Sequence, residues 1–139
     1  MVTWRYRLDT AYTLKSPHLA GICFCNEWLR IGDGALTIPA GYAWDGCSPA
    51  WRVPGGLWLG TPDGPPGIDG RPPTFYPSLV HDALCQFAAD VPVTRAATVA
   101  LFHDMLRAAG MPAWCAALYA AAVRAFGPAA FGGDPHPAA

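Results

Sequence analysis

The residues best suited to chemistry in this chain are His81 and Asp82, which are adjacent and stand at the start of a predicted helix. Imidazole is the side chain whose unperturbed pKa lies nearest neutral pH, and a carboxylate beside it can orient the ring or bind a cation. The positive end of the helix dipole also favours an ionised Asp82. A second polar segment, residues 41–49, contains Asp45. If the fold brings Asp45 to His81, the three residues form a small active site with His81 as general base.

The same three residues also admit a structural interpretation. A His-Asp pair at the start of a helix can hold a loop against that helix by hydrogen bonds, and such networks perturb side chains as an active site does. Both interpretations predict that the Asp45 carboxylate lies against the imidazole of His81.

A second His-Asp pair, His103 and Asp104, follows the first pair in the chain. Together the two pairs supply the histidines and aspartates that metal-dependent phosphohydrolases use as metal ligands. The helical periodicity places both side chains away from the apolar stripe formed by Leu101, Phe102 and Met105. We therefore expect this pair to face solvent as part of an ordinary polar helix surface.

Cysteine and threonine supply three weaker candidates. Cys85 follows His81 by four residues, a spacing at which an imidazole can activate a thiol, and Cys47 lies in the polar segment. Packing as small buried residues is the interpretation we favour for both cysteines. Thr98 lies within a predicted buried stripe, where its hydroxyl either bonds back to the preceding turn or faces His81 across a helix pair.

The turn-rich middle of the chain contains candidate binding residues, namely Trp44, Ser48, Trp51 and Trp58. Exposed tryptophan rings in a loop could hold a glycan or a cell-wall polymer. The backbone around Ser48 could offer N–H or C=O groups to a substrate or to Ca²⁺.

These residues must be positioned by a sheet and a set of helices. Alternation of apolar and polar residues predicts strands in the first forty residues, and the Gly32-Asp33-Gly34 segment predicts a hairpin turn. Turn-forming residues dominate from Pro39 to Pro77, which predicts a long loop.

Three helices are predicted after this loop. The first begins after Pro77 with Ser78 as its N-cap, the second extends from Thr94 to Gly110, and the third extends from Pro112 to Phe126. The predicted fold class is therefore α+β, with a small N-terminal antiparallel sheet, a long Pro/Gly loop and three packed helices. We expect a single domain over residues 1–127 and a flexible C-terminal tail over residues 128–139.

Composition narrows the classes of function. The chain has 139 residues, of which 53% are hydrophobic and 14% charged, with a net charge of −1. Without clustered basic residues, nucleic acid is not an expected partner. The low charge favours an assembly surface, so we expect self-association or contact with other proteins.

The chain also lacks the patterns of secretion and membrane insertion. The first residues carry no apolar signal-peptide run, and the longest apolar helix is shorter than a bilayer span. The five cysteines form no CxxC pair, which favours free thiols in a reducing compartment.

Several of these segments resemble a family of small phage and prophage proteins of unassigned function. The matching segments are Leu36 to Tyr42, Asp45 to Ser48, Val80 to Asp82 and Tyr119 to Gly127, in the family's order and spacing. The resemblance covers roughly residues 31–127. It implies a phage- or prophage-encoded accessory or virion protein, made in the host cytoplasm and incorporated into the particle, with other virion proteins as partners.

The predicted helix pair is also similar to the core of secreted phospholipases A2. In those enzymes a His-Asp pair on one helix meets an aspartate on the next helix. By this resemblance His81 would activate water and Asp82 would bind calcium, the one cofactor implied. The partner aspartate would fall at Thr98, so this chain departs from the pattern there and Asp45 would have to replace it.

Three hypotheses follow from the sequence. The leading one is a phage accessory or virion protein in which the His-Asp cluster is structural. The second is a small hydrolase of a phospholipid or another ester or amide, with His81 as base and Asp45 or Asp82 behind it. The third is a non-catalytic module that binds a glycan or cell-wall polymer through its loop tryptophans.

Overall fold

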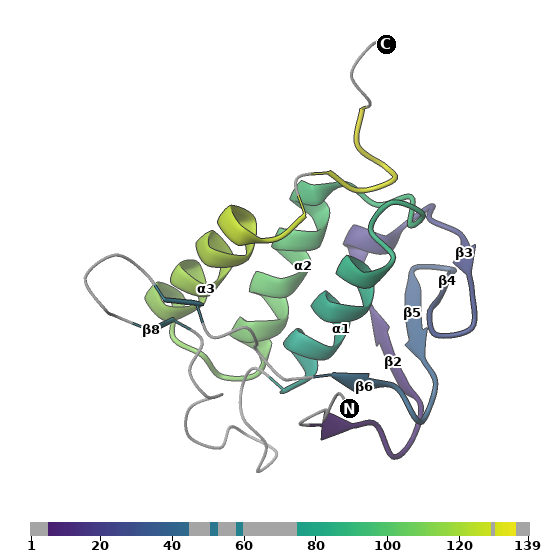
Figure 1. Ribbon diagram of the computed structural model, residues 1–139, viewed down its shortest axis with the longest axis horizontal. Helices are drawn as coiled ribbons and strands as arrows, with labels where there is room; N and C mark the ends of the chain where they lie inside the picture. The colour runs from purple at the N-terminus through teal and green to yellow at the C-terminus, as the bar shows by residue number, and fades with distance from the viewer. Residues whose placement is uncertain (1–5, 45–50, 53–57, 60–74, 129, 136–139) are drawn as a thin grey trace.

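The computed structural model describes residues 6–44, 51–52, 58–59, 75–128 and 130–135. The predicted α+β fold class is confirmed, because an antiparallel sheet near the N-terminus is followed by three helices. Figure 1 shows the order of the layers: the sheet lies at one end, then α1, then α2, and α3 lies at the other end. The strands are β1 (Tyr6–Arg7), β2 (Tyr12–Lys15), β3 (Phe24–Cys25), β4 (Arg30–Gly32), β5 (Ala35–Ile38), β6 (Ala43–Trp44), β7 (Trp51–Arg52) and β8 (Trp58–Leu59); the helices are the short 3-10 helix η1 (Pro17–Leu19), α1 (Phe75–Gln86), α2 (Arg95–Ala108) and α3 (Ala113–Phe126).

The described strands form three separate antiparallel sheets. The largest is four-stranded, in the order β2-β5-β4-β3. The predicted hairpin joins β4 to β5, and its turn residues Asp33 and Gly34 have positive φ angles of 52° and 74°. This conformation is typical of a two-residue type I′ turn, for which an Asp-Gly pair is well suited. Strand β1 pairs with β6, and β7 pairs with β8 inside the segment predicted to be a long loop.

The boundaries of α2 and α3 follow local sequence signals, whereas the start of α1 does not. Thr94 is the N-cap of α2, and its hydroxyl accepts a hydrogen bond from the Ala97 N–H at 3.0 Å. Gly110, just past the end of α2, has a φ of +99°, as expected of a helix-terminating glycine. The predicted start of α1 is wrong: the helix begins at Phe75, and Ser78 lies inside it, donating to the Phe75 carbonyl oxygen at 3.0 Å.

Two hydrophobic cores share α2. The larger core lies between the sheet and the α1–α2 pair and contains Leu36, Leu79 and Leu101. The smaller core lies between α2 and α3 and contains Phe102 and Leu106. Helix α2 is therefore the central element, and it positions side chains on both of its flanks.

The segment after α3 returns to the start of α2. The Gly132 N–H donates to the Ala88 carbonyl oxygen at 2.7 Å, and the Gly133 N–H donates to the Val93 carbonyl oxygen at 2.9 Å. The Phe131 side chain is buried in the larger core. Residues 131–134, which composition assigns to a loose tail, are therefore held by backbone hydrogen bonds and by an aromatic anchor.

Helix length also bears on membrane insertion. Among the described helices, none combines the length and the hydropathy that a membrane crossing requires.

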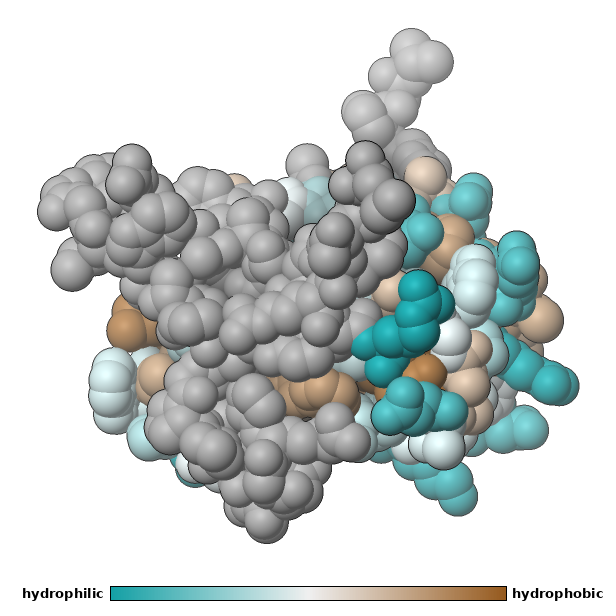
Figure 2. Space-filling model, turned by 60° about the horizontal axis from the view of Figure 1, so that its bottom comes forward, coloured by the Kyte–Doolittle hydropathy of each residue, from teal (hydrophilic) through white to brown (hydrophobic). Residues whose placement is uncertain are grey.

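Figure 2 shows hydrophilic side chains gathered over the strand side of the face that it presents.

Candidate functional site

The Asp82 carboxylate joins α1 to the segment between β5 and β6. Tyr42 follows Gly41, whose φ of +95° turns the chain there, and the phenol ring is buried in the larger core. The Tyr42 hydroxyl lies 2.7 Å from Asp82 Oδ2 and 2.8 Å from Gln86 Oε1. Because a phenol carries one hydrogen, it donates to the charged carboxylate, and the Gln86 amide can present its NH₂ group to the phenol oxygen.

Burial and charge keep this phenol protonated. Burial raises the pKa of Tyr42 well above its ordinary value, and the neighbouring Asp82 raises it further. The Tyr42 hydroxyl is therefore protonated near neutral pH and acts as a hydrogen-bond donor. This contact ties the strand half of the molecule to α1.

The His81 ring is packed between two helices. Its centroid lies 5.1 Å from that of Phe102 on α2, and its Nδ1 and Nε2 lie 3.6 Å and 3.5 Å from the Cys85 Sγ. Burial lowers the pKa of His81 to about 4, so the imidazole is neutral near pH 7. Among the described residues, no carboxylate is bonded to the ring.

The neighbouring thiol is unreactive by the same physical cause. Burial raises the pKa of Cys85 to about 12, and the charge of Asp82 adds to the shift. A thiol that stays protonated is a weak nucleophile, because the thiolate is the reactive form. The raised pKa therefore favours a partly buried packing role for Cys85 over that of a His-activated nucleophile.

The remaining predicted site residues are distributed as follows. Asp45 and Ser48 lie outside the described residues, so the predicted contact between Asp45 and His81 stays a prediction. Trp51 and Trp58 lie in β7 and β8, and only their backbone is described. Trp44 is fully buried and its indole N–H donates to the Ser78 hydroxyl at 3.0 Å, so it belongs to the core and cannot contact a polymer at the surface.

Two further expectations concern Thr98 and calcium. The Thr98 hydroxyl donates to the Thr94 carbonyl oxygen at 3.0 Å, which is the bond back to the preceding turn. In the part of the chain that the structure describes, no group of three or more His, Cys, Asp or Glu side chains is placed to hold a metal ion. The calcium role of Asp82 therefore stays a prediction.

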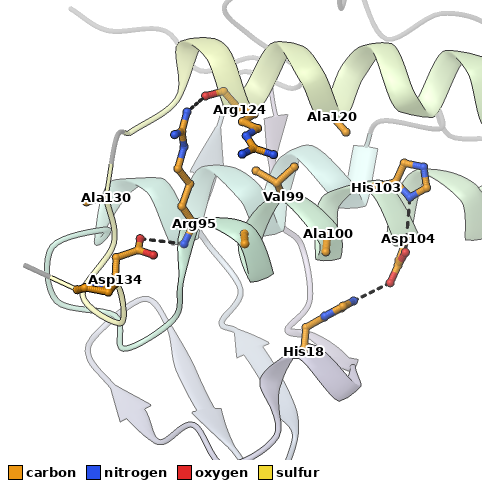
Figure 3. Close-up of a pocket in the computed structure, with 12 residues that line it drawn as sticks. His18, Arg95, Val99, Ala100, His103, Asp104, Ala120, Arg124, Ala130 and Asp134 are labelled. Atoms are coloured by element: carbon orange, nitrogen blue, oxygen red, sulfur yellow. Dashed lines mark hydrogen bonds and ion pairs between the residues drawn. The ribbon is translucent and has the colours of Figure 1, made fainter.

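The described residues also form a pocket that the sequence did not predict. It has a volume of about 760 Å³ and lies along the groove between α2 and α3, next to η1 and the C-terminal segment (Figure 3). Its lining residues are His18, Arg95, Ala96, Val99, Ala100, His103, Asp104, Ala120, Arg124, Ala130, Asp134 and Pro135.

One wall of the pocket contains a His-Asp-His cluster. His18 Nε2 lies 2.8 Å from Asp104 Oδ2, and His103 Nδ1 lies 3.6 Å from Asp104 Oδ1. The side chains of His103 and Asp104 are 37% and 59% exposed, as the helical wheel predicts, and both also line the pocket. His18 is 86 residues away in sequence, and the packing of η1 against α2 brings it there. No local sequence signal marks that approach.

The other end of the pocket contains two arginines. The Arg95 guanidinium donates to the Arg124 carbonyl oxygen in the last turn of α3 (Figure 3). The Asp134 carboxylate accepts hydrogen bonds from the backbone N–H groups of Arg95 and Phe131, at 2.9 Å and 2.8 Å. The negative charge of this acceptor at the first N–H of α2 also interacts favourably with the positive end of the helix dipole.

The chain matches no protein-family model, no curated protein and no solved structure.

Proposed function

We propose that this chain is a phage- or prophage-encoded accessory or virion protein, and that its His81-Asp82 pair is structural rather than catalytic. The phage context rests on the motif resemblance over residues 31–127. The structural role is supported above all by the Tyr42–Asp82 hydrogen bond of 2.7 Å, which links the strand half of the molecule to α1.

The state of His81 supports the same proposal. A general base works best with a pKa near the operating pH and with an orienting partner on its second nitrogen. Burial instead lowers the pKa of His81 to about 4, and the ring contacts described are the Cys85 thiol and the Phe102 ring. These neighbours suit a packed side chain that fills the space between α1 and α2.

The partner surface in this proposal is the outer face of α3. Trp114 and Leu118 are exposed by 69% and 47%, and their spacing of four residues places them on one side of the helix. Large exposed apolar side chains on one helix face are typical of an assembly surface. Other virion proteins or a second copy of the chain would cover it.

The structural role of the Asp82 contact is tested by the variant Tyr42→Phe. Removal of the hydroxyl takes a donor from Asp82 and an acceptor from Gln86, and we expect a loss of about 2 kcal/mol in the free energy of unfolding, measured by urea denaturation. The matched control is Tyr12→Phe, because the Tyr12 ring stacks on Tyr76 at 4.5 Å and would keep that contact. Equal stability of the two variants would contradict the structural role.

The choice between structure and catalysis is tested by His81→Ala. We expect a less stable protein, by roughly 1–3 kcal/mol, and no phospholipid, ester or amide hydrolysis in either the original chain or the variant. Turnover by the original chain that disappears in a folded His81→Ala variant would establish the hydrolase instead.

The virion assignment has its own test. Particles induced from a lysogen that carries the gene are purified by density gradient, and their peptides are identified by mass spectrometry. We expect peptides of this chain in intact particles or in assembly intermediates. Its absence from both would overturn the assignment without affecting the structural role of Asp82.

A further inference from the structure

We propose that the pocket between α2 and α3 binds a small organic anion, whose phosphate or carboxylate group pairs with Arg124 and whose apolar part lies on the pocket floor. This site is separate from the Tyr42–Asp82 contact, and none of His81, Asp82 and Cys85 lines it. The charges of the pocket, its unsatisfied donor and its size support this site.

The negative charges in the pocket already have partners. Asp134 Oδ2 accepts two backbone N–H groups, and the two oxygens of Asp104 face His18 and His103. The Arg124 guanidinium, by contrast, has no carboxylate partner among the described residues, and Figure 3 shows it beside Val99 within the groove. The pocket therefore presents an arginine whose charge is available to an anion.

Arg95 adds an unsatisfied donor. Its guanidinium is held against the Arg124 carbonyl oxygen, while its Nε is buried without a hydrogen-bond partner in the described part of the chain. A buried donor without an acceptor costs free energy, and binding of an oxyanion nearby would supply an acceptor. An oxyanion in the pocket would allow Arg95 to turn this N–H towards an acceptor.

The size and the floor of the pocket determine the rest of the ligand. A volume of about 760 Å³ lies within the usual range for small-molecule sites. The floor consists of the short apolar side chains of Val99, Ala100 and Ala120, which leave space above them (Figure 3). A bare inorganic ion would fill little of this space, whereas a compact apolar body would cover the floor.

The experiment is an NMR titration of backbone amides with three probes of similar size. Phenyl phosphate and benzoate carry an anionic group on an apolar ring, and benzyl alcohol carries the ring without the charge. We expect one or both anions to shift amides of residues 95–104 and 120–124, and benzyl alcohol to leave them unchanged. The arm that binds tells a phosphate ligand from a carboxylate ligand.

Three variants locate the site. Arg124→Gln removes the charge and should weaken anion binding by about tenfold. Ala100→Leu fills the floor without changing the charge and should weaken it at least as much. Arg30→Gln removes an exposed charge on β4, outside the pocket, and should leave the affinity within about twofold.

Three results would overturn the proposal: no shifts with either anion at millimolar concentration, equal affinity in Arg124→Gln and the original chain, or equal binding of benzyl alcohol. Failure of this proposal would leave the structural role of Asp82 unaffected, because the two rest on different residues.

Discussion

At the scale of single residues, the buried imidazole of His81 makes stability depend on pH. Burial holds its pKa at about 4 in the folded chain, against an ordinary value of 6.5. Between these values the unfolded chain binds more protons than the folded chain, so protons favour unfolding as the pH falls. The contribution of the neutral ring is complete above pH 6.5 and is lost progressively towards pH 4.

We therefore expect the protein to lose about 2 kcal/mol of stability through this group between pH 7.5 and pH 5. Urea denaturation at the two pH values measures the loss, and the variant His81→Leu should show a correspondingly smaller drop. The control variant His103→Leu keeps the buried ring and should retain the drop. Identical pH dependence in His81→Leu and the original chain would contradict this account.

The Cys85 thiol yields a second prediction at this scale. Because burial raises its pKa to about 12, the thiolate is scarce at pH 8, and alkylation by iodoacetamide should be roughly a thousandfold slower than for an ordinary thiol. Cys23 and Cys25 are exposed and serve as internal references in the same sample. Mass spectrometry of the labelled peptides measures all three rates, and a Cys85 that reacts as fast as these two would show that its thiol is accessible and ionised.

At the scale of elements, two contacts hold the first turn of α2 in place. Thr94 caps its first turn, and Asp134 accepts the N–H of Arg95 from the far end of the chain. This second contact depends on the close approach of the C-terminal segment to the connection between α1 and α2. Glycine makes the approach feasible, because a Cβ atom on Gly132 would lie 2.6 Å from the Val91 carbonyl oxygen.

The variant Gly132→Ala should accordingly destabilise the protein by about 1–3 kcal/mol and free residues after 128 for proteolysis. Limited digestion followed by mass spectrometry detects the released segment, and urea denaturation measures the stability. The matched control is Gly32→Ala on β4, where an added Cβ meets nothing within 4 Å. Similar behaviour of the two variants would show that the C-terminal segment does not stabilise α2.

At the scale of the whole molecule, the two cores of the described residues leave one face of α3 exposed. Helix α3 contributes Ala116 and Val123 to the smaller core, while Trp114 and Leu118 are exposed. Burial of such apolar surface on another protein is favourable by roughly 25 cal/mol per Å² before the costs of association.

We expect the variant Trp114→Glu to reduce self-association or particle incorporation, because it places a charge in the centre of this face. Sedimentation velocity over a range of concentrations measures self-association, and Ala108→Glu adds the same charge at an exposed position on α2. Unchanged association of Trp114→Glu, both with itself and with particles, would show that this face is not the assembly surface.

The sequence predicted the elements better than the contacts between them. The hairpin turn at Asp33-Gly34, the start of the second helix at Thr94 and its stop at Gly110 follow from backbone preferences of a few adjacent residues, and the structure has all three. The start of α1 was misplaced at Ser78, because a serine after a proline imitates an N-cap. Its hydroxyl is instead bonded to the Phe75 carbonyl oxygen and to the Trp44 indole.

By itself, then, the sequence determined the fold class and singled out His81, Asp82 and Cys85. Only the tertiary structure decided what these groups do, because burial between α1 and α2 sets the protonation of His81 and Cys85, and a residue forty positions away supplies the partner of Asp82. The α2–α3 pocket is likewise a tertiary feature. Its histidines, arginines and aspartates come from four separated segments, and periodicity within one helix carries no information about which segments will pack beside it.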